Sequence, residues 1–328
     1  MAVNNSGITE ILPDNCAIKS KNLPILLVGY RREDLLRRRF EEIVDIDVPK
    51  IFVAIDATPK GPVAEIIDLI TEYKGKLSNI DFCIRIQESN LGLTRHMTSA
   101  ISWALEEERA VIVIEDDIKI DKNSYLSFNK GFHLHQEMGR TGIVGGFSPL
   151  RQPKFTKRNY WRKTCHFSVW GWIATCENWA NYTYDLSEIN LARELSKSET
   201  WNELSRYRRA VWISRFTRTK MNPLNTWDIQ MEFCSLVHGY RNLLPMFRFV
   251  ENEGYDDERS VHTTGARPRW FKPIDSRVFE VPRKLISRGA IMLFFEVLDS
   301  ITFLGDNRVI NFYTHTAKKK IARLFLVK

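Results

Sequence analysis

The sequence has few cysteines and no motif that pairs them. Its 5 cysteines among 328 residues are widely scattered, and no two have the C-x-x-C spacing of a zinc or redox site. This spacing does not support a disulfide framework of the kind that stabilises small secreted domains. The pattern favours a protein of a reducing compartment, and we expect a cytoplasmic location.

Long hydrophobic runs and several binding motifs are also missing. No stretch reaches the roughly 18 uncharged apolar residues that a membrane span needs, and the first 22 residues lack the charged and apolar regions of a signal peptide. No zinc finger, RNP-like or helix-turn-helix pattern occurs, so we expect no nucleic-acid partner. The composition, 44% hydrophobic and 27% charged, is that of a globular protein with a full core.

Basic residues are in excess only in the second half of the chain. Residues 1–150 contain 18 Lys and Arg against 22 Asp and Glu, a net charge of −4, whereas residues 151–328 contain 30 against 18, a net charge of +12. The segment RQPKFTKRNYWRKTCHFSVW is either a solvated basic face or a loop that contacts phosphates. Its six basic residues, with no acid among them, are Arg151, Lys154, Lys157, Arg158, Arg162 and Lys163.

Strand and helix patterns alternate over the first 120 residues. Four short apolar runs, LPILLVGY, KIFVAID, IDFCIRI and AVIVIED, are typical of strands covered on both faces of a mainly parallel sheet. Between them, EDLLRRRFEEIV, PVAEIIDLITEY and TRHMTSAISWALEEE have helical spacing of apolar residues, the second with a proline in its first turn. The alternation predicts an α/β fold with a Rossmann-like, doubly wound mixed sheet, which binds ligands at the carboxyl ends of its strands.

Three consecutive carboxylates follow the fourth predicted strand, in VIVIEDDIKI. Glu115, Asp116 and Asp117 raise one another's free energy unless a positive group lies between them. A divalent metal ion is the candidate that we favour, although an acidic group after a strand also occurs in ordinary turns and helix caps.

These segments together resemble a known family. LPILLVGYRRED, IFVAIDAT, ESNLGLTRHMTSAISWAL and VIVIEDDIKI, in this order, resemble the nucleotide-sugar-binding half of GT-A glycosyltransferases. The triplet resembles the E-D-D form of their D-x-D motif, as in N-acetylglucosaminyltransferase I and in family-2-like bacterial sugar transferases. HFSVWGWIATCENW, NTWDIQMEF and ENEGYDDERSVHT resemble the acceptor side of bacterial relatives, so the similarity covers about residues 24–265.

The resemblance implies an organisation of the chain. Residues 1–22 would be an N-terminal extension, 23–150 the nucleotide-sugar-binding half, 151–265 the acceptor-binding half of the same GT-A domain, and 266–328 a helical, basic and amphipathic C-terminal extension. The tail carries apolar stripes beside Lys318, Lys319, Lys320, Arg323 and Lys328, while Glu296 and Asp299 argue against a span. It would either lie on an anionic membrane surface, making the protein peripheral on the inner face, or dock on its own domain or on a second subunit.

The resemblance also assigns a donor site. Asp117 and His262 would bind Mn²⁺ or Mg²⁺, with the imidazole favouring Mn²⁺. Asp116 would contact the ribose or a metal-bound water, and Glu115 would lie nearer the strand end. Arg32, Asp56 and His96 resemble contacts to the nucleotide; a surface arginine, a turn aspartate and a helix-face histidine are the alternative interpretations.

The acceptor side needs a base and a sugar-binding surface. An inverting transfer requires one carboxylate to remove the proton of the attacking hydroxyl, and we predict Asp228, with Glu232 four residues later as the second candidate. Asp228 would otherwise be a first-turn acid that stabilises a helix. Trp170, Gly171 and Trp172 form a segment that either stacks on sugar rings or belongs to the core.

The leading hypothesis is a metal-dependent, inverting glycosyltransferase of the hexosyl- or N-acetylhexosaminyltransferase class, acting in polysaccharide biosynthesis. It would move a sugar from a nucleotide-sugar, preferably a UDP-sugar, to a hydroxyl of a glycan, lipid-linked saccharide or protein. A nucleotidyltransferase is one alternative, although no Gly-rich phosphate loop follows LLVGYRRED. A non-catalytic sugar- or polyanion-binding protein of the same fold is the other.

Overall fold

The computed structural model describes most of the chain between residues 22 and 257. The described residues are 22–138, 141–154, 159–222, 226–257 and 259, together with 281–282, 284–286, 294–295 and 298–299. The predicted N-terminal extension, most of the predicted C-terminal extension and His262 lie outside these residues.

The first half forms the predicted β-α units. β1 (Ile25–Gly29), β2 (Lys50–Ile55), β3 (Asp81–Ile86) and β4 (Ala110–Glu115) pair in parallel, in the spatial order β4-β1-β2-β3. They alternate with α1 (Glu33–Val44), α2 (Ala64–Lys76) and α3 (Leu93–Glu107). The strands and helices read from hydrophobic periodicity are therefore confirmed. Two details differ: α2 begins after Pro62, with Val63 as N-cap residue, and the edge strand β3 is only partly buried.

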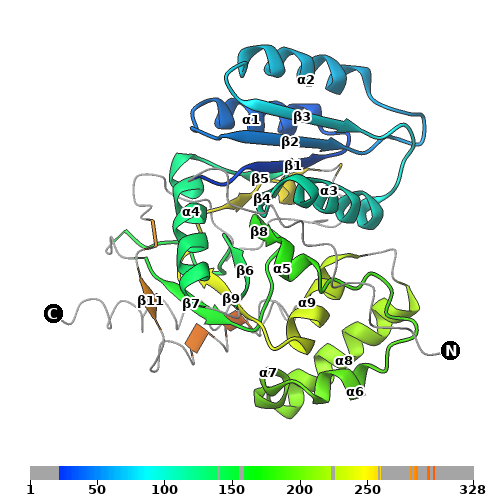
Figure 1. Cartoon of the computed structure of the whole chain (residues 1–328), viewed down its shortest axis with the longest axis vertical. Coiled ribbons are helices and arrows are strands. Elements are labelled where there is room, and N and C mark those ends of the chain that lie inside the picture. The colour runs from blue at the N-terminus through cyan, green and yellow to red at the C-terminus, as the bar shows by residue number, and fades with distance from the viewer. Residues whose placement is uncertain are drawn as a thin grey trace.

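The second half extends the same sheet with strands of both directions. β8 (Trp172–Thr175) pairs antiparallel with both β4 and β6 (Thr141–Gly145). β9 (Arg241–Pro245), β7 (Trp161–Thr164) and β11 (Leu285–Ile286) follow, giving nine strands in the order β11-β7-β9-β6-β8-β4-β1-β2-β3. The predicted α/β class with a doubly wound mixed sheet is confirmed, and both halves share one continuous sheet (Figure 1).

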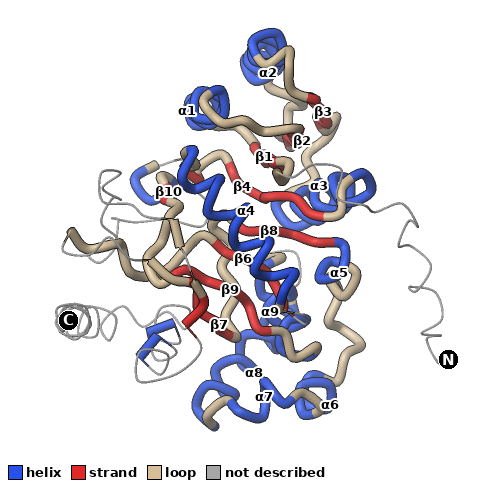
Figure 2. The backbone as a smooth tube through the Cα atoms, turned by 60° about the vertical axis from the view of Figure 1, so that its left-hand side comes forward, coloured by secondary structure: helices blue, strands red, loops and turns tan. Residues whose placement is uncertain are grey.

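Helices cover both faces of the sheet (Figure 2). α1, α2 and α4 (Lys122–Glu137) bury apolar residues against one face, and α3 and α9 (Asp228–Val237) bury theirs against the other. The apolar stripe of α1 predicted from spacing, Leu35, Leu36, Phe40 and Ile43, is buried. α5 (Cys176–Trp179), α6 (Leu191–Ser196), α7 (Glu199–Glu203) and α8 (Arg206–Met221) belong to the second half, and α6 to α9 enclose a further apolar cluster. Burial of these stripes is the main term that fixes the helices on the sheet.

The described residues of the C-terminal segment are packed on the protein's own second half. Phe295 and Leu298 are buried with Leu150, Met246 and Phe247. Asp299 accepts hydrogen bonds from the Arg162 guanidinium of β7, one of them at 2.8 Å, and from the Thr164 hydroxyl at 3.1 Å. Arg162, which the sequence analysis assigned either to a solvated basic face or to a loop that contacts phosphates, is thus paired inside the protein. No helix within the described residues is long and apolar enough to cross a membrane.

Candidate functional site

The acidic triplet lies where the topology predicts, at the carboxyl end of β4. Glu115 is the last residue of β4 and pairs in register with Val28 of β1, and the Asp116 amide donates to the Val28 carbonyl at 3.0 Å. Both strands therefore end at one level, and the loop after β1 delivers Arg32 at the N-cap position of α1. Asp116 and Asp117 are buried and Glu115 is half-buried.

The positive group between the carboxylates is Arg32. Its Nη2 donates to Asp116 Oδ1 and, at 3.1 Å, to Asp117 Oδ2, while Nε donates to Asp116 Oδ2 at 3.3 Å. One guanidinium thus bridges two aspartates, and only 14% of its side chain is exposed. The sequence argument that something positive must separate these acids holds, but in the structure a side chain fills the place that we expected a metal ion to take.

The triplet titrates far from its usual range. Burial raises the pKa of Asp116 to about 6 against the opposing effect of Arg32, and it also raises the pKa of Asp117. The pKa of Glu115 is well above its ordinary value because of burial and the nearby charges of Asp117 and Asp116. Burial lowers the pKa of Arg32, but the two aspartates raise it by more, so Arg32 stays charged. Three acids that share one cation leave the pocket short of positive charge.

The residues present fit a divalent cation through their oxygen donors. Mg²⁺ and Mn²⁺ sites are commonly completed by one or two carboxylates, substrate phosphates and water, and Asp116 and Asp117 supply such carboxylates. Gly254 lies against them: a Cβ on this residue would come within 2.5 Å of Asp117 Oδ2. Within the described residues, no group of three or more His, Cys, Asp or Glu side chains is arranged as a metal site. His262, the predicted second ligand, is outside them.

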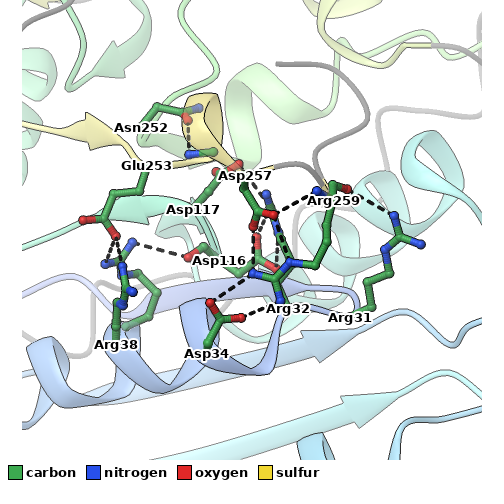
Figure 3. Close-up of polar contacts among 12 residues, drawn as sticks. Arg31, Arg32, Asp34, Arg38, Asp116, Asp117, Asn252, Glu253, Asp257 and Arg259 are labelled. Atoms are coloured by element: carbon green, nitrogen blue, oxygen red, sulfur yellow. Dashed lines mark hydrogen bonds and ion pairs between the residues drawn. The ribbon is translucent and has the colours of Figure 1, made fainter. Parts of the chain in front are cut away.

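A segment distant in sequence returns to the triplet. β10 (Glu251–Asn252) pairs antiparallel with β5 (Ile118–Lys119), the short strand that follows Asp117, and η2 (Gly254–Asp256) comes next. The Glu253 amide donates to the Asp117 carbonyl at 2.8 Å, and Asn252 Oδ1 accepts from the Gly254 amide at 2.8 Å. Figure 3 shows this return segment, residues 251–257, beside Asp116 and Asp117. The sequence analysis placed ENEGYDDER on the acceptor side, whereas the structure brings it to the acidic triplet.

Buried charges behind the triplet were missed by the sequence analysis. Arg39 of α1, which is fully buried, donates to the Asp116 carbonyl at 3.3 Å, to Glu253 Oε2 at 2.9 Å and to Glu42 Oε1 at 2.9 Å. It therefore ties α1, the triplet and the return segment together. An arginine within RRRF at a helical position between Leu36 and Phe40 was the available signal, because its spacing places it toward the core.

Asp56 and His96 lie together at the end of β2. Asp56 accepts from the Leu91 and Gly92 amides at 2.9 and 3.0 Å and from the Asn90 side chain at 3.3 Å, so it organises the loop before α3. His96 is buried with Nε2 3.3 Å from the Ala54 carbonyl oxygen, and its Nδ1 has no hydrogen-bond partner. Burial lowers the pKa of His96 against the opposing charge of Asp56, which keeps the imidazole neutral.

Asp228, the predicted base, interacts electrostatically with Glu115 of the acidic triplet. It is the first residue of α9, it accepts a hydrogen bond from the Thr226 hydroxyl, and its charge contributes to the raised pKa of Glu115. Arg215 of α8, a residue that the sequence analysis did not single out, interacts electrostatically with Asp228, and burial lowers its pKa. The structure thus brings Asp228 and the acidic triplet into one electrostatic environment.

Glu232, the alternative base, has different surroundings. It is buried, accepts from the Phe167 amide at 2.6 Å, and has Oε1 3.8 Å from His166 Nδ1. Burial raises the pKa of Glu232 to about 8, and burial lowers the pKa of His166 to about 4, so both groups are neutral near pH 7. A neutral carboxylic acid is a poor proton acceptor.

Trp170 and Trp172 differ in how deeply they are buried. Trp172 is fully buried on β8 and stacks on Trp227 with ring centroids 5.6 Å apart, which makes it a core residue. Trp170 is partly buried, with its ring edge-on to Phe147 and to Tyr255 of the return segment. Gly171 has φ +66°, and a Cβ there would meet Phe128 and Val250 at 3.2 Å, so the backbone turn between the two rings favours glycine.

Comparisons with known proteins give a similarity of architecture. No protein-family model matches the sequence, and no curated protein matches it. A mannosyltransferase from Pyrobaculum calidifontis, solved with GDP-Man and Mn²⁺, is similar over 67% of this chain and 74% of its own, at 11% identity and a TM-score of 0.40. A UDP-glucose pyrophosphorylase solved with UDP-glucose is similar over 69% and 91%, at 8% identity and a TM-score of 0.35. S. aureus TarS is similar over 38% of this chain, at 15% identity and a TM-score of 0.31, and the match spans 21% of TarS.

Proposed function

We propose that this protein is a GT-A-type glycosyltransferase that depends on a divalent cation and transfers a sugar with inversion from a nucleotide-sugar, preferably a UDP-sugar, to a hydroxyl group. The acceptor would be a glycan, a lipid-linked saccharide or a protein, in a step of polysaccharide assembly. The observation that supports this most is the position of Asp116 and Asp117, which are buried directly after β4 where Glu115 pairs in register with Val28 of β1.

The donor is assigned to the β1, β2 and β4 strand ends. Asp117, with His262, would hold Mn²⁺ or Mg²⁺, and Asp116 would bind the ribose or a water on the ion. The cation, when bound, stabilises the charge of the departing diphosphate. Neutral His96 donates from Nε2 to the Ala54 carbonyl, so its unpaired Nδ1 would accept a hydrogen bond from the base, and Arg32 would bind a phosphate. Asp56 already holds the 90–92 loop, so it would shape this pocket as well as contact the nucleotide.

The acceptor is assigned to the α9 and β8 side. Asp228 would remove the proton of the attacking hydroxyl on the face opposite the diphosphate. Trp170 and Gly171 would meet the sugar, while Trp172 supports them from the core. Glu232 remains the second candidate base, for which its raised pKa is unfavourable.

A donor panel tests this function. The full chain is incubated with UDP-, GDP- and dTDP-sugars, with Mn²⁺ or with a chelator, and release of nucleoside diphosphate is measured. We expect slow hydrolysis of one donor that stops on chelation. Asp117→Asn should remove cation-dependent donor binding, whereas Asp228→Asn should retain binding and lower transfer by about 10² to 10⁴-fold, the usual contribution of a general base.

Matched variants make the test specific. Asp185→Asn changes an exposed turn acid of the same half and should transfer at the wild-type rate. Glu232→Gln should also transfer, and the assignment of the base moves to Glu232 if this variant fails while Asp228→Asn remains active. Release of pyrophosphate from a nucleoside triphosphate, with no hydrolysis of any sugar nucleotide, would contradict the proposal in favour of a nucleotidyltransferase.

A further inference from the structure

Arg32 is bonded to Asp117, the residue that the proposed function gives to the cation, and to Asp116 beside it. Its Nη2 contacts Asp116 Oδ1 and lies 3.1 Å from Asp117 Oδ2, and its Nε lies 3.3 Å from Asp116 Oδ2. Figure 3 shows the guanidinium reaching up from the start of α1 to both carboxylates. A divalent ion on Asp117 would lie next to this guanidinium, so the two cations would repel one another and compete for the same negative charge.

We propose that Arg32 is an internal counter-cation, which competes with the divalent ion for Asp116 and Asp117 and gives them up when a diphosphate offers it another anion. The inference rests on the proposed function, because that function supplies the diphosphate and the ion. Arg32 is then a positioning residue: it makes the binding of cation and nucleotide depend on each other.

The local structure allows Arg32 to move. It is the N-cap residue of α1: its carbonyl accepts a helical hydrogen bond from the Leu36 amide at 3.0 Å, whereas its side chain makes no capping bond and can move without breaking the helix. About 14% of the Arg32 side chain and 11% of the Asp117 side chain are exposed, so the pair is open to solvent on one side. A guanidinium binds phosphate oxygens with the same two-pronged geometry as a carboxylate, so the exchange replaces one charge-assisted pair with another.

The charge balance requires both ligands to arrive together. If Arg32 left alone, the three acidic side chains would lose the guanidinium bonded to their oxygens, and if a diphosphate approached alone it would meet the same three acids. Neighbouring arginines are already paired: Arg39 with Glu42 and Glu253, and Arg259 with Asp34 and Asp257. We therefore expect cation and nucleotide to raise each other's affinity by about 5 to 150-fold, the common range of coupling between two ligands.

The test measures binding of Mn²⁺ alone. Free Mn²⁺ is titrated by electron paramagnetic resonance against the wild-type chain, Arg32→Gln, Arg32→Lys and Arg38→Gln. Arg38 is the matched control, since it lies on the same helix, is more than half exposed, and contacts Glu253 at 3.8 Å rather than the triplet. We expect Arg32→Gln to bind Mn²⁺ about 10-fold more tightly than wild type, Arg38→Gln to match wild type, and Arg32→Lys to fall between them.

A second titration adds saturating UDP, then GDP and dTDP. The nucleotide should tighten Mn²⁺ binding to the wild-type chain and to Arg38→Gln, but much less to Arg32→Gln, where no competitor is left to remove. A purely structural role of Arg32 would lower the melting temperature without tightening Mn²⁺ binding. If Arg32→Gln does not fold, Arg32→Lys gives the same comparison, because lysine keeps the charge but loses the two-pronged contact.

The titrations distinguish a failure of the counter-cation role of Arg32 from a failure of the proposed function. If Arg32→Gln binds Mn²⁺ no more tightly than wild type while UDP still tightens Mn²⁺ binding to both, the counter-cation role is wrong and the proposed function stands. If Arg32→Gln binds Mn²⁺ more tightly but no nucleoside diphosphate changes the affinity of the wild-type chain, competition is supported and the proposed function, with the diphosphate's part in releasing Arg32, is overturned. Absence of Mn²⁺ binding by every variant overturns both.

Discussion

Arg32 and Arg162 each bind aspartate inside this protein, but the carboxylates around them differ in number and in exposure. Arg162 pairs with one acid, Asp299, which also accepts from Thr164, and the two side chains are 2% and 0% exposed. Arg32 serves two aspartates and is within the field of Glu115, with 14% of its side chain exposed.

The difference separates a structural cluster from a functional one. The charge of Arg162 is balanced by one carboxylate, and its guanidinium lies over the Phe295 ring at 4.6 Å. This cluster therefore has no uncompensated charge that a ligand would neutralise. The Arg32 cluster holds more negative than positive charge and raises the pKa of its acids, a state that a cation would relieve. Charge imbalance at a strand end, rather than the presence of an ion pair, is what marks the candidate site.

The largest expected effect is the loss of Asp299. Asp299→Ala leaves the Arg162 charge buried without its carboxylate, and we expect it to lower the free energy of unfolding by about 3–5 kcal/mol, measured by urea denaturation. The corresponding change in the other cluster, Asp116→Asn, should alter stability by less than about 1 kcal/mol, because Asp117 still pairs with Arg32 and one of two like charges is removed.

A double variant sharpens this comparison. Arg162→Met with Asp299→Leu removes both charges, and it should recover most of the stability that Asp299→Ala loses, since an apolar pair has no desolvation penalty. If Asp116→Asn destabilises the protein as much as Asp299→Ala, the two clusters are energetically alike and the contrast drawn here is wrong.

Sequence patterns predicted the first half well because its strands and helices follow from the spacing of apolar residues within each segment. β-Branched runs gave β1 to β4, apolar spacing gave α1 to α3, and the strand-end rule placed the triplet at the edge where ligands bind. The same methods missed every long-range pairing at the site. Residues 118 and 252 meet in β5 and β10, and Arg162 meets Asp299, through contacts between segments more than 130 residues apart.

The sequence predicts a positive group beside the triplet but does not predict that this group is Arg32. The need for a positive group beside the triplet follows from electrostatics, but the choice between an arginine and a metal ion depends on which side chain can reach it. Whether Arg32 can reach the triplet depends on the register of β1 against β4 and on the start of α1 at Glu33. Neither feature can be predicted from the residues around the triplet.

A smaller effect is expected from a third buried acid, Glu232, which has no arginine bonded to it. Its folded-state pKa of about 8 lies above its ordinary value of 4.5, so the folded protein holds a proton that the unfolded chain has released between these values. Stability therefore falls as the pH rises through this window. Glu232→Gln has no group that titrates at this position, so its stability does not fall in this window. The unfolding free energy of the variant minus that of wild type should therefore increase by on the order of 2–4 kcal/mol from about pH 5 to about pH 8.

The His166 contribution does not disturb this comparison. Its pKa is lowered to about 4 from 6.5, so its stabilising effect is lost as the pH falls through that range, in wild type and variant alike. A pH-independent difference between Glu232→Gln and wild type, followed by urea denaturation at several pH values, would show that Glu232 is ionised in the folded state. It would then rank beside Asp228 as a base.

A more modest effect than that at Glu232 is expected within the Arg32 cluster, at Gly254. A Cβ there would come 2.5 Å from Asp117 Oδ2 and 3.1 Å from Asn252 Oδ1, so Gly254→Ala must displace the Asp117 carboxylate or the return segment. We expect a loss of about 1–3 kcal/mol in stability from the crowding, with weaker Mn²⁺ binding in the same titration. Gly75→Ala is the matched control: it lies in α2 with nothing within 4 Å of the new Cβ, and it should raise stability by roughly 0.5–1 kcal/mol. If Gly254→Ala is as stable as Gly75→Ala and binds Mn²⁺ as tightly as wild type does, glycine at position 254 is not required to position the Asp117 carboxylate. The Arg32 cluster would then be as insensitive to a substitution beside it as an exposed ion pair is.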